Sequence, residues 1–160
     1  MKQVVVLGGG PAGSMAAARL ARAGLKTIVF DEKLAWEKPC GGGITYKAYQ
    51  QYPFLRENAT PKKLITETCL AAPKSGSVQL RLSEPLLIYS RYDLNRMLLE
   101  RAGDAGAQIE PSRVLGLERK GAGWLVRTRH GSLESDFCVV ATGARNTLRE
   151  VGTEWTASDT

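Results

Sequence analysis

The stretch QVVVLGGGPAGSMAAARLARAGLKTIVFD, residues 3–31, decides the fold of this chain. It opens with a β-branched run, Gln3 to Leu7, which is typical of a strand buried on both faces of a parallel sheet. A glycine-rich turn follows, and then an alanine-rich segment that favours a helix. Gly24 is a natural helix end, and a second β-branched run ends at Asp31. Strand, turn, helix and strand within about 30 residues predict one βαβ unit.

The glycine turn satisfies the pattern G-x-G-x-x-G with Gly8, Gly10 and Gly13. Gly8 permits the tight turn, Gly10 lets a pyrophosphate approach the backbone, and Gly13 lets the helix pack close to the strand. Pro11 and Ala12 complete the turn at a helix N-terminus, where N–H groups and a partial positive charge favour a phosphate. We therefore expect these five residues to bind a dinucleotide, against the alternative of an ordinary glycine-rich turn.

Asp31 stands 18 residues after Gly13, at the end of the second strand. A carboxylate there accepts a hydrogen bond from a ribose 2′-hydroxyl and repels a 2′-phosphate, which disfavours NADP. Glu32 is the alternative for this role. The motif alone does not separate FAD from NAD, because both cofactors use it.

Composition limits the class of protein. The chain has 160 residues, of which 43% are hydrophobic and 24% charged, as in one folded domain. The net charge is +6, but the basic residues are scattered, so we expect no nucleic-acid partner. No apolar run reaches the roughly 18 residues of a membrane span, and glycines interrupt the apolar start. We expect a cytoplasmic protein without a transmembrane segment, and peripheral membrane contact stays open.

The chain has three cysteines and one histidine. An odd number of cysteines without C-x-x-C spacing argues against a disulfide framework and a zinc site, so we expect no metal. Cys69 and Cys138 are expected in the core. His130, beside a glycine, is expected in an exposed turn.

The middle of the chain departs from the βαβ pattern. A loop and a short helix are expected in residues 32–64. Short antiparallel strands are expected in residues 64–89, broken by Pro73, Gly76 and Pro85, with the alternating segment 78–82 half-buried.

The later residues predict a capped helix and several strands. The helix spans residues 90–102 and has an S-x-x-D capping signature at Ser90 and Asp93. Four strands are expected after this helix, and the last of them is apolar enough to be central in the sheet. Their ranges are 107–110, 114–118, 123–128 and 133–142. Residues 103–106 resemble a flavoprotein G-D motif, but a helix-to-strand turn is the better interpretation.

Four segments together resemble the geranylgeranyl reductase family of FAD-dependent oxidoreductases, which belongs to the same group as the aromatic hydroxylases. They are the glycine turn with Asp31, the K-P-C-G-G-G segment from Lys38, the S-R-Y-D-L segment at Ser90, and the V-A-T-G-A segment at Val140. The resemblance covers roughly residues 2–150. The P-C-G-G-G element points to the reductase branch, whereas the other segments are shared by the wider group.

The resemblance implies FAD as cofactor. It assigns Lys38, Cys40 and Gly41 to the flavin's surroundings, without a catalytic role for any of them, and Arg91 to a cofactor contact. It assigns the A-T-G turn, Ala141, Thr142 and Gly143, to the cofactor as well. The plainer alternatives are that Cys40 is a small residue of a glycine loop and that Arg91 is a solvated residue at a helix start.

We therefore expect an α/β, Rossmann-like FAD-binding domain with an inserted antiparallel β layer. Residues 1–150 form this domain, which is incomplete before its last strand and the substrate domain, and residues 151–160 are a polar tail at a truncation point. The implied reaction is flavin-dependent reduction of an isoprenoid double bond in a small-molecule substrate. The alternatives are an FAD-dependent monooxygenase, a non-catalytic cofactor-binding fragment and an NAD-binding dehydrogenase domain.

Overall fold

The computed structural model describes residues 1–39, 42–143 and 148. The chain divides into two compact units, and each is described by itself. The first unit consists of Met1–Trp36 and Asn95–Thr160, and the second of Glu37–Leu94.

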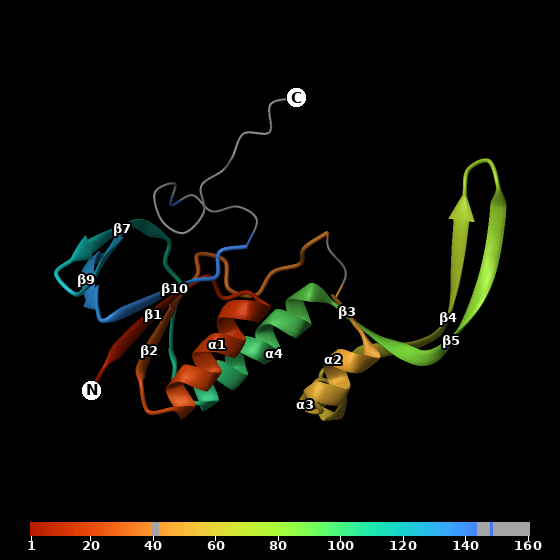
Figure 1. Cartoon of the computed structure of the whole chain (residues 1–160), viewed down its shortest axis with the longest axis horizontal. Coiled ribbons are helices and arrows are strands. Elements are labelled where there is room, and N and C mark those ends of the chain that lie inside the picture. Colours follow the sequence, from red (N-terminus) through yellow and green to blue (C-terminus); the bar gives the residue numbers. More distant parts are fainter. Residues whose placement is uncertain (40–41, 144–147, 149–160) are drawn as a thin grey trace. The chain divides into compact units, whose positions relative to one another are not determined.

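A parallel sheet forms the centre of the first unit, with the strand order β10-β1-β2-β6 among the described residues (Figure 1). The predicted βαβ unit is confirmed: β1 (Gln3–Leu7) is followed by α1 (Pro11–Arg22) and β2 (Lys26–Phe30). The outer strands are β6 (Gln108–Glu110) and β10 (Phe137–Val140).

Both faces of β1 are buried, as its β-branched run predicts. On one face it packs against small residues of α1 and of α4 (Arg91–Asp104), which let the helices approach the sheet closely. This core contains Val6, Ala17, Ala18, Val29, Ala102 and Ala107. On the other face lies an antiparallel meander of β7 (Val114–Lys120), β8 (Gly123–Thr128) and β9 (Gly131–Ser135). The core there contains Val5, Leu7, Leu117, Val126 and Leu148.

The single strand expected over residues 133–142 is two strands. The chain leaves the meander after β9 and joins the parallel sheet as β10, and Asp136 marks the change. Its carboxylate accepts from the Gln3 N–H at 2.7 Å and pairs with Lys2 at 3.0 Å. The expected central position is also wrong, because β10 is an edge strand of the described sheet and Phe137 is 53% exposed.

The second unit contains β3 (Gly42–Ile44), the short helices α2 (Tyr46–Gln51) and α3 (Phe54–Glu57), and a long hairpin. Two buried tyrosines hold the short helices to the base of the hairpin. The Tyr49 hydroxyl donates to the Pro85 carbonyl at 2.9 Å, and the Tyr89 hydroxyl donates to the Leu55 carbonyl. Burial raises the pKa of Tyr89, which keeps its hydroxyl proton available as a donor.

The hairpin consists of β4 (Lys62–Ala72) and β5 (Gly76–Tyr89). Ile65 pairs with Leu86, and the next pair is Glu67 with Arg81, so one residue of β4 lies opposite four of β5. The expected break at Pro85 is wrong, because β5 continues through it. Pro85 lies in the bulge, where its missing N–H group costs the strand ladder no hydrogen bond.

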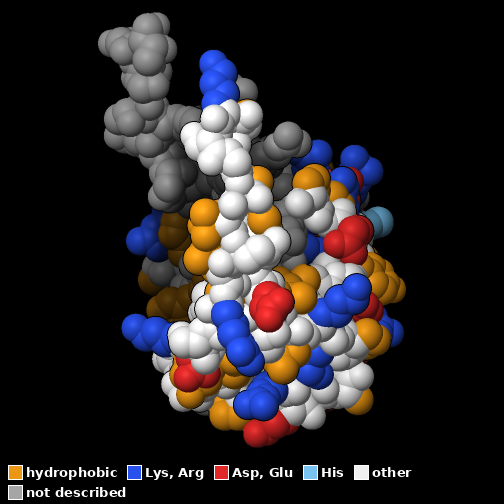
Figure 2. All heavy atoms as spheres, turned by 90° about the vertical axis from the view of Figure 1, so that its right-hand side faces the viewer, with side chains coloured by type: hydrophobic (Ala, Val, Ile, Leu, Met, Phe, Trp, Pro, Cys, Tyr) orange, Lys and Arg blue, Asp and Glu red, His pale blue; other side chains and the backbone are white. Residues whose placement is uncertain are grey.

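The outer half of the hairpin is amphipathic but exposed on both faces. Leu70 pairs with Val78 and is 60% exposed, and Val78 is 59% exposed, so the half-buried strand expected here is wrong. Cys69 is exposed on the opposite face, next to Gln79 across the ladder, so its expected core position is wrong as well. Figure 2, which looks onto the hairpin, shows hydrophobic side chains at its surface.

Other expectations agree with the structure. His130 is exposed in the turn between β8 and β9, and a helix-to-strand turn with Gly106 at a positive φ of 97° follows α4, although the helix continues through Gly103 and Asp104 beyond its expected end at residue 102. No helix in the described part of the chain is long and apolar enough to cross a membrane.

The two described cysteines should react very differently with thiol reagents. Burial raises the pKa of Cys138 to about 11, so that at pH 8 roughly one molecule in a thousand carries its thiolate. In a Cys40→Ser background, we expect iodoacetamide to label exposed Cys69 first and Cys138 only as the pH rises toward 11, as followed by mass spectrometry of peptides. Equal labelling at pH 8 would contradict the packing of β10.

Candidate cofactor site

The glycine turn is built on a close approach of backbone segments. A Cβ atom on Gly13 would lie 1.9 Å from the Gly8 carbonyl oxygen, and one on Gly8 would lie 2.5 Å from the Ala141 oxygen. Gly8 also has φ of 106°, which disfavours any other residue. These distances agree with the structural reasons predicted for Gly8 and Gly13.

Gly10 differs from its neighbours, because a Cβ atom there would meet nothing within 4 Å. It is the N-cap of α1, with Pro11 in the first turn, and neither a side-chain cap nor an acidic residue is found at this end among the described residues. Open space beside a helix N-terminus whose own first turn has no acidic residue suits a bound phosphate, although the Asp31 carboxylate lies nearby at the Gly9 N–H. The residues therefore fit the phosphates of a dinucleotide at this turn.

The A-T-G turn lies against the glycine turn. The Ala141 N–H donates to the Leu7 carbonyl at 2.8 Å, which continues the β1–β10 pairing, and Gly143 has a positive φ of 76°. The structure thus brings Gly8, Gly13 and Ala141 together at the carboxyl ends of β1 and β10, the edge where parallel sheets bind ligands.

Asp31 is engaged by the backbone. One carboxylate oxygen accepts from the Gly9 N–H at 2.7 Å, and the other accepts from the N–H groups of Lys33 and Leu34, each at 2.9 Å. The bond to Leu34 fixes a non-glycine residue at φ of 53°. Asp31 therefore joins the glycine turn to the loop after β2.

These bonds limit what Asp31 can offer a ribose. A carboxylate has about four acceptor positions, and three backbone donors leave about one for a hydroxyl group. Glu32, the next residue, is exposed and stays the alternative acceptor for the ribose hydroxyl. The sequence motif did not reveal this internal use of Asp31, although an aspartate two and three residues before the bonded N–H groups is typical of Asx turns.

The second unit holds Lys38 and Arg91, whereas Cys40 and Gly41 lie outside the described residues. Glu37, which the sequence interpretation overlooked, is bonded to the start of α4. Its carboxylate accepts from the Ser90 hydroxyl at 2.8 Å, the Arg91 N–H at 2.9 Å and the Tyr92 N–H at 3.3 Å. These hydrogen bonds, first the one from Ser90, hold the pKa of Glu37 below its usual range.

Arg91 retains an unmet hydrogen-bonding group. Its Nε atom is buried and has no hydrogen-bond partner among the described residues. Buried donors are normally paired, so an unpaired guanidinium nitrogen is consistent with an anionic ligand.

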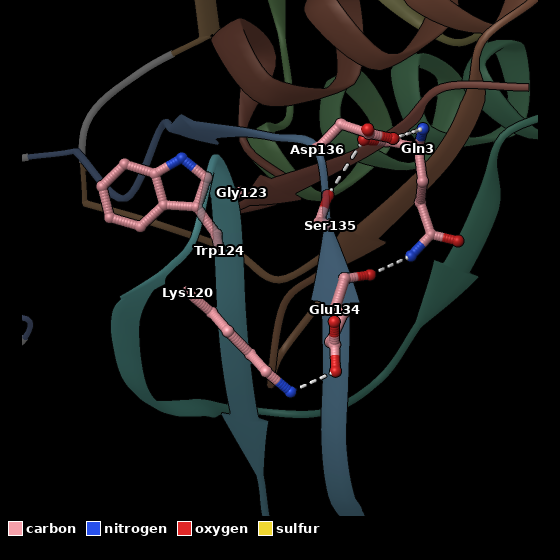
Figure 3. A pocket seen from close by; sticks show the side chains of 7 residues that line it. All are labelled: Gln3, Lys120, Gly123, Trp124, Glu134, Ser135 and Asp136. Atoms are coloured by element: carbon pink, nitrogen blue, oxygen red, sulfur yellow. Dashed lines mark hydrogen bonds and ion pairs between the residues drawn. The ribbon is translucent and has the colours of Figure 1, made fainter.

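A polar hollow lies at the opposite end of β1 from the glycine turn (Figure 3). Its lining groups bond to one another: Gln3 donates to the Glu134 carbonyl at 2.5 Å, and Lys120 pairs with the Glu134 carboxylate. The hollow is therefore a seam between the meander and β1. No group of metal-ligating side chains is found in residues 1–39, 42–143 and 148.

A comparison with protein families matches residues 2–154 to the pyridine nucleotide-disulphide oxidoreductases. The chain belongs to this family. A geranylgeranyl diphosphate reductase of Synechocystis sp. is 57% identical over 120 residues, which are 72% of this chain and 29% of that protein. The resemblance to geranylgeranyl reductases is therefore confirmed, and the chain spans less than a third of this relative's length.

Solved structures of two proteins share the fold of this chain. A geranylgeranyl bacteriochlorophyll reductase-like protein of Thermoplasma acidophilum has a TM-score of 0.71 at 22% identity, covering 88% of this chain and 40% of its own. The p-nitrophenol 4-monooxygenase of Pseudomonas putida has a TM-score of 0.74 at 17% identity, covering 94% and 44%. At these identities the likeness confirms the fold class alone.

Gly13 and Gly10 should respond oppositely to alanine. Because a Cβ on Gly13 meets backbone, we expect Gly13→Ala to lower the free energy of unfolding by about 1–3 kcal/mol or more. Gly10→Ala adds a methyl group in open space at φ of −68°, and should stay within about 1 kcal/mol of wild type. Urea unfolding followed by circular dichroism measures both, and equal losses would contradict the turn geometry.

Asp31→Ala should destabilise the fold even without cofactor. Loss of the shared acceptor for three N–H groups is expected to cost about 1–3 kcal/mol of unfolding free energy. Glu32→Ala, one residue away and exposed, is the matched control and should change it by at most about 0.5 kcal/mol. If both variants unfold like wild type, Asp31 does not hold the turn.

Proposed function

We propose that this chain is the FAD-binding part of a flavin-dependent oxidoreductase that reduces isoprenoid double bonds. The observation that carries the proposal is the open N-terminus of α1 at Gly10, whose first turn has no acidic residue, within a chain that is 57% identical over 120 residues to a protein named geranylgeranyl diphosphate reductase. The relatives' names and the resemblance of the P-C-G-G-G segment to the reductase branch support an isoprenoid substrate.

The chain's own residues supply binding and orientation. Gly8, Gly10 and Gly13 would let the FAD pyrophosphate approach the start of α1, and the backbone-engaged Asp31 would offer its remaining acceptor position to the adenosine ribose. The bound flavin would supply the hydride. Lys38, Arg91 and the A-T-G turn are assigned to the cofactor by the family resemblance.

The reductase is favoured over the rival functions. The monooxygenase neighbours have low sequence identity and support the shared fold, whereas the reductase relative is similar in sequence. A cytoplasmic location stays a prediction from the sequence.

Titration of the purified chain into FAD, with NAD as competitor, tests the cofactor. We expect saturable quenching of flavin fluorescence that NAD does not reverse. Gly10→Val should abolish this binding, because the side chain fills the space left for the pyrophosphate, while its circular dichroism stays that of wild type.

Gly103→Ala, in α4 with open space around its Cβ, serves as the control. It should bind FAD as wild type does. Folded wild-type chain that does not bind FAD, or Gly10→Val that binds it normally, would contradict the assignment.

A further inference from the structure

The N-terminus of α4 is closed by the protein itself. The Arg91 and Tyr92 N–H groups donate to Glu37, the Asp93 N–H donates to the Ser90 hydroxyl at 3.1 Å, and the Leu94 N–H donates to the Ser90 carbonyl at 3.0 Å. Every N–H of this first turn thus has an acceptor. The helix end is not available to a phosphate, in contrast to the N-terminus of α1.

Glu37 makes this cap from outside the helix. It precedes Lys38 directly, and it bonds to Ser90 across 53 positions of sequence. One carboxylate therefore links the start of the K-P-C-G segment to the backbone of Arg91. The family resemblance assigns both Lys38, which follows Glu37 in the chain, and Arg91, which Glu37 bonds, to the cofactor.

The negative charge is needed for this arrangement. Three donors, one hydroxyl and two backbone N–H groups, share the two carboxylate oxygens, and a helix N-terminus favours an anion. A glutamine side chain has one acceptor oxygen and brings two donors of its own, so it cannot satisfy the same set.

We propose that Glu37 is a positioning residue for FAD: by capping α4 it holds Arg91 in place, so that the guanidinium with its unpaired Nε receives the cofactor. The proposal rests on the proposed function and adds a residue that acts through Arg91 rather than on the flavin. Arg91 then binds the anion that the closed helix end cannot bind.

A double-mutant cycle tests this. We expect Glu37→Gln to weaken FAD binding about fivefold or more, the cost of a lost helix cap expressed as affinity. In an Arg91→Ala background the same change should alter the Kd by less than about twofold, because residues that act as a unit are not additive. Glu57→Gln, an exposed glutamate of the same unit on α3, is the matched control and should leave the Kd unchanged.

Thermal unfolding by circular dichroism accompanies each titration, so that Kd values are compared where every variant is folded. Glu37→Asp, which keeps the charge but is one methylene shorter, replaces Glu37→Gln if that variant does not fold, with the same expected loss. An unchanged Kd in the folded variant, or a full loss repeated in the Arg91→Ala background, would overturn the positioning role. A wild-type chain that does not bind FAD would refute the proposed function and this inference together.

Discussion

The first unit depends on one close approach of backbone, that of α1 to the end of β1. Helix and strand come this near only because Gly13 faces the Gly8 carbonyl and Gly8 faces Ala141, with no Cβ atom between them. The small residues Ala17 and Ala18 continue the contact along the helix. Since β10 pairs with β1 at the same edge, one steric condition aligns the helix, the glycine turn and the A-T-G turn.

Local patterns predicted the helices and strands well, because the signals for a βαβ unit and for a capped helix lie in consecutive residues. The predictions that were wrong, or that the sequence could not give, concern contacts between residues distant in sequence. Asp136 divides the last strand by bonding to the start of β1, and Glu37 caps a helix that begins at position 91. Cys69 and Val78 were expected to be buried, but strand alternation identifies an apolar face without identifying what covers it.

The same limit applies to the candidate site. The spacing of glycines and of Asp31 identified the residues and the edge of the sheet. It did not reveal that the Asp31 carboxylate is largely occupied by backbone donors, because these donors, Gly9 in the glycine turn and Lys33 and Leu34 in the loop after β2, lie in segments without regular structure. The two helix starts also differ: Gly10 and Pro11 at the start of α1 offer no side-chain acceptor, whereas α4 is preceded by Ser90, whose hydroxyl accepts from Asp93, and is capped from a distance in sequence by Glu37.

The bulge of the hairpin separates two regions that can vary independently. Inside it, the pairing from Lys62 to Ile65 is fixed by the buried Tyr89 and its bonds to the short helices. Beyond it, the ladder from Glu67 to Ala72 runs to an exposed turn, and its paired Leu70 and Val78 are exposed. Insertions or deletions of matched residue pairs near the tip would thus leave the inner register intact, so the hairpin's length is free to diverge among homologues.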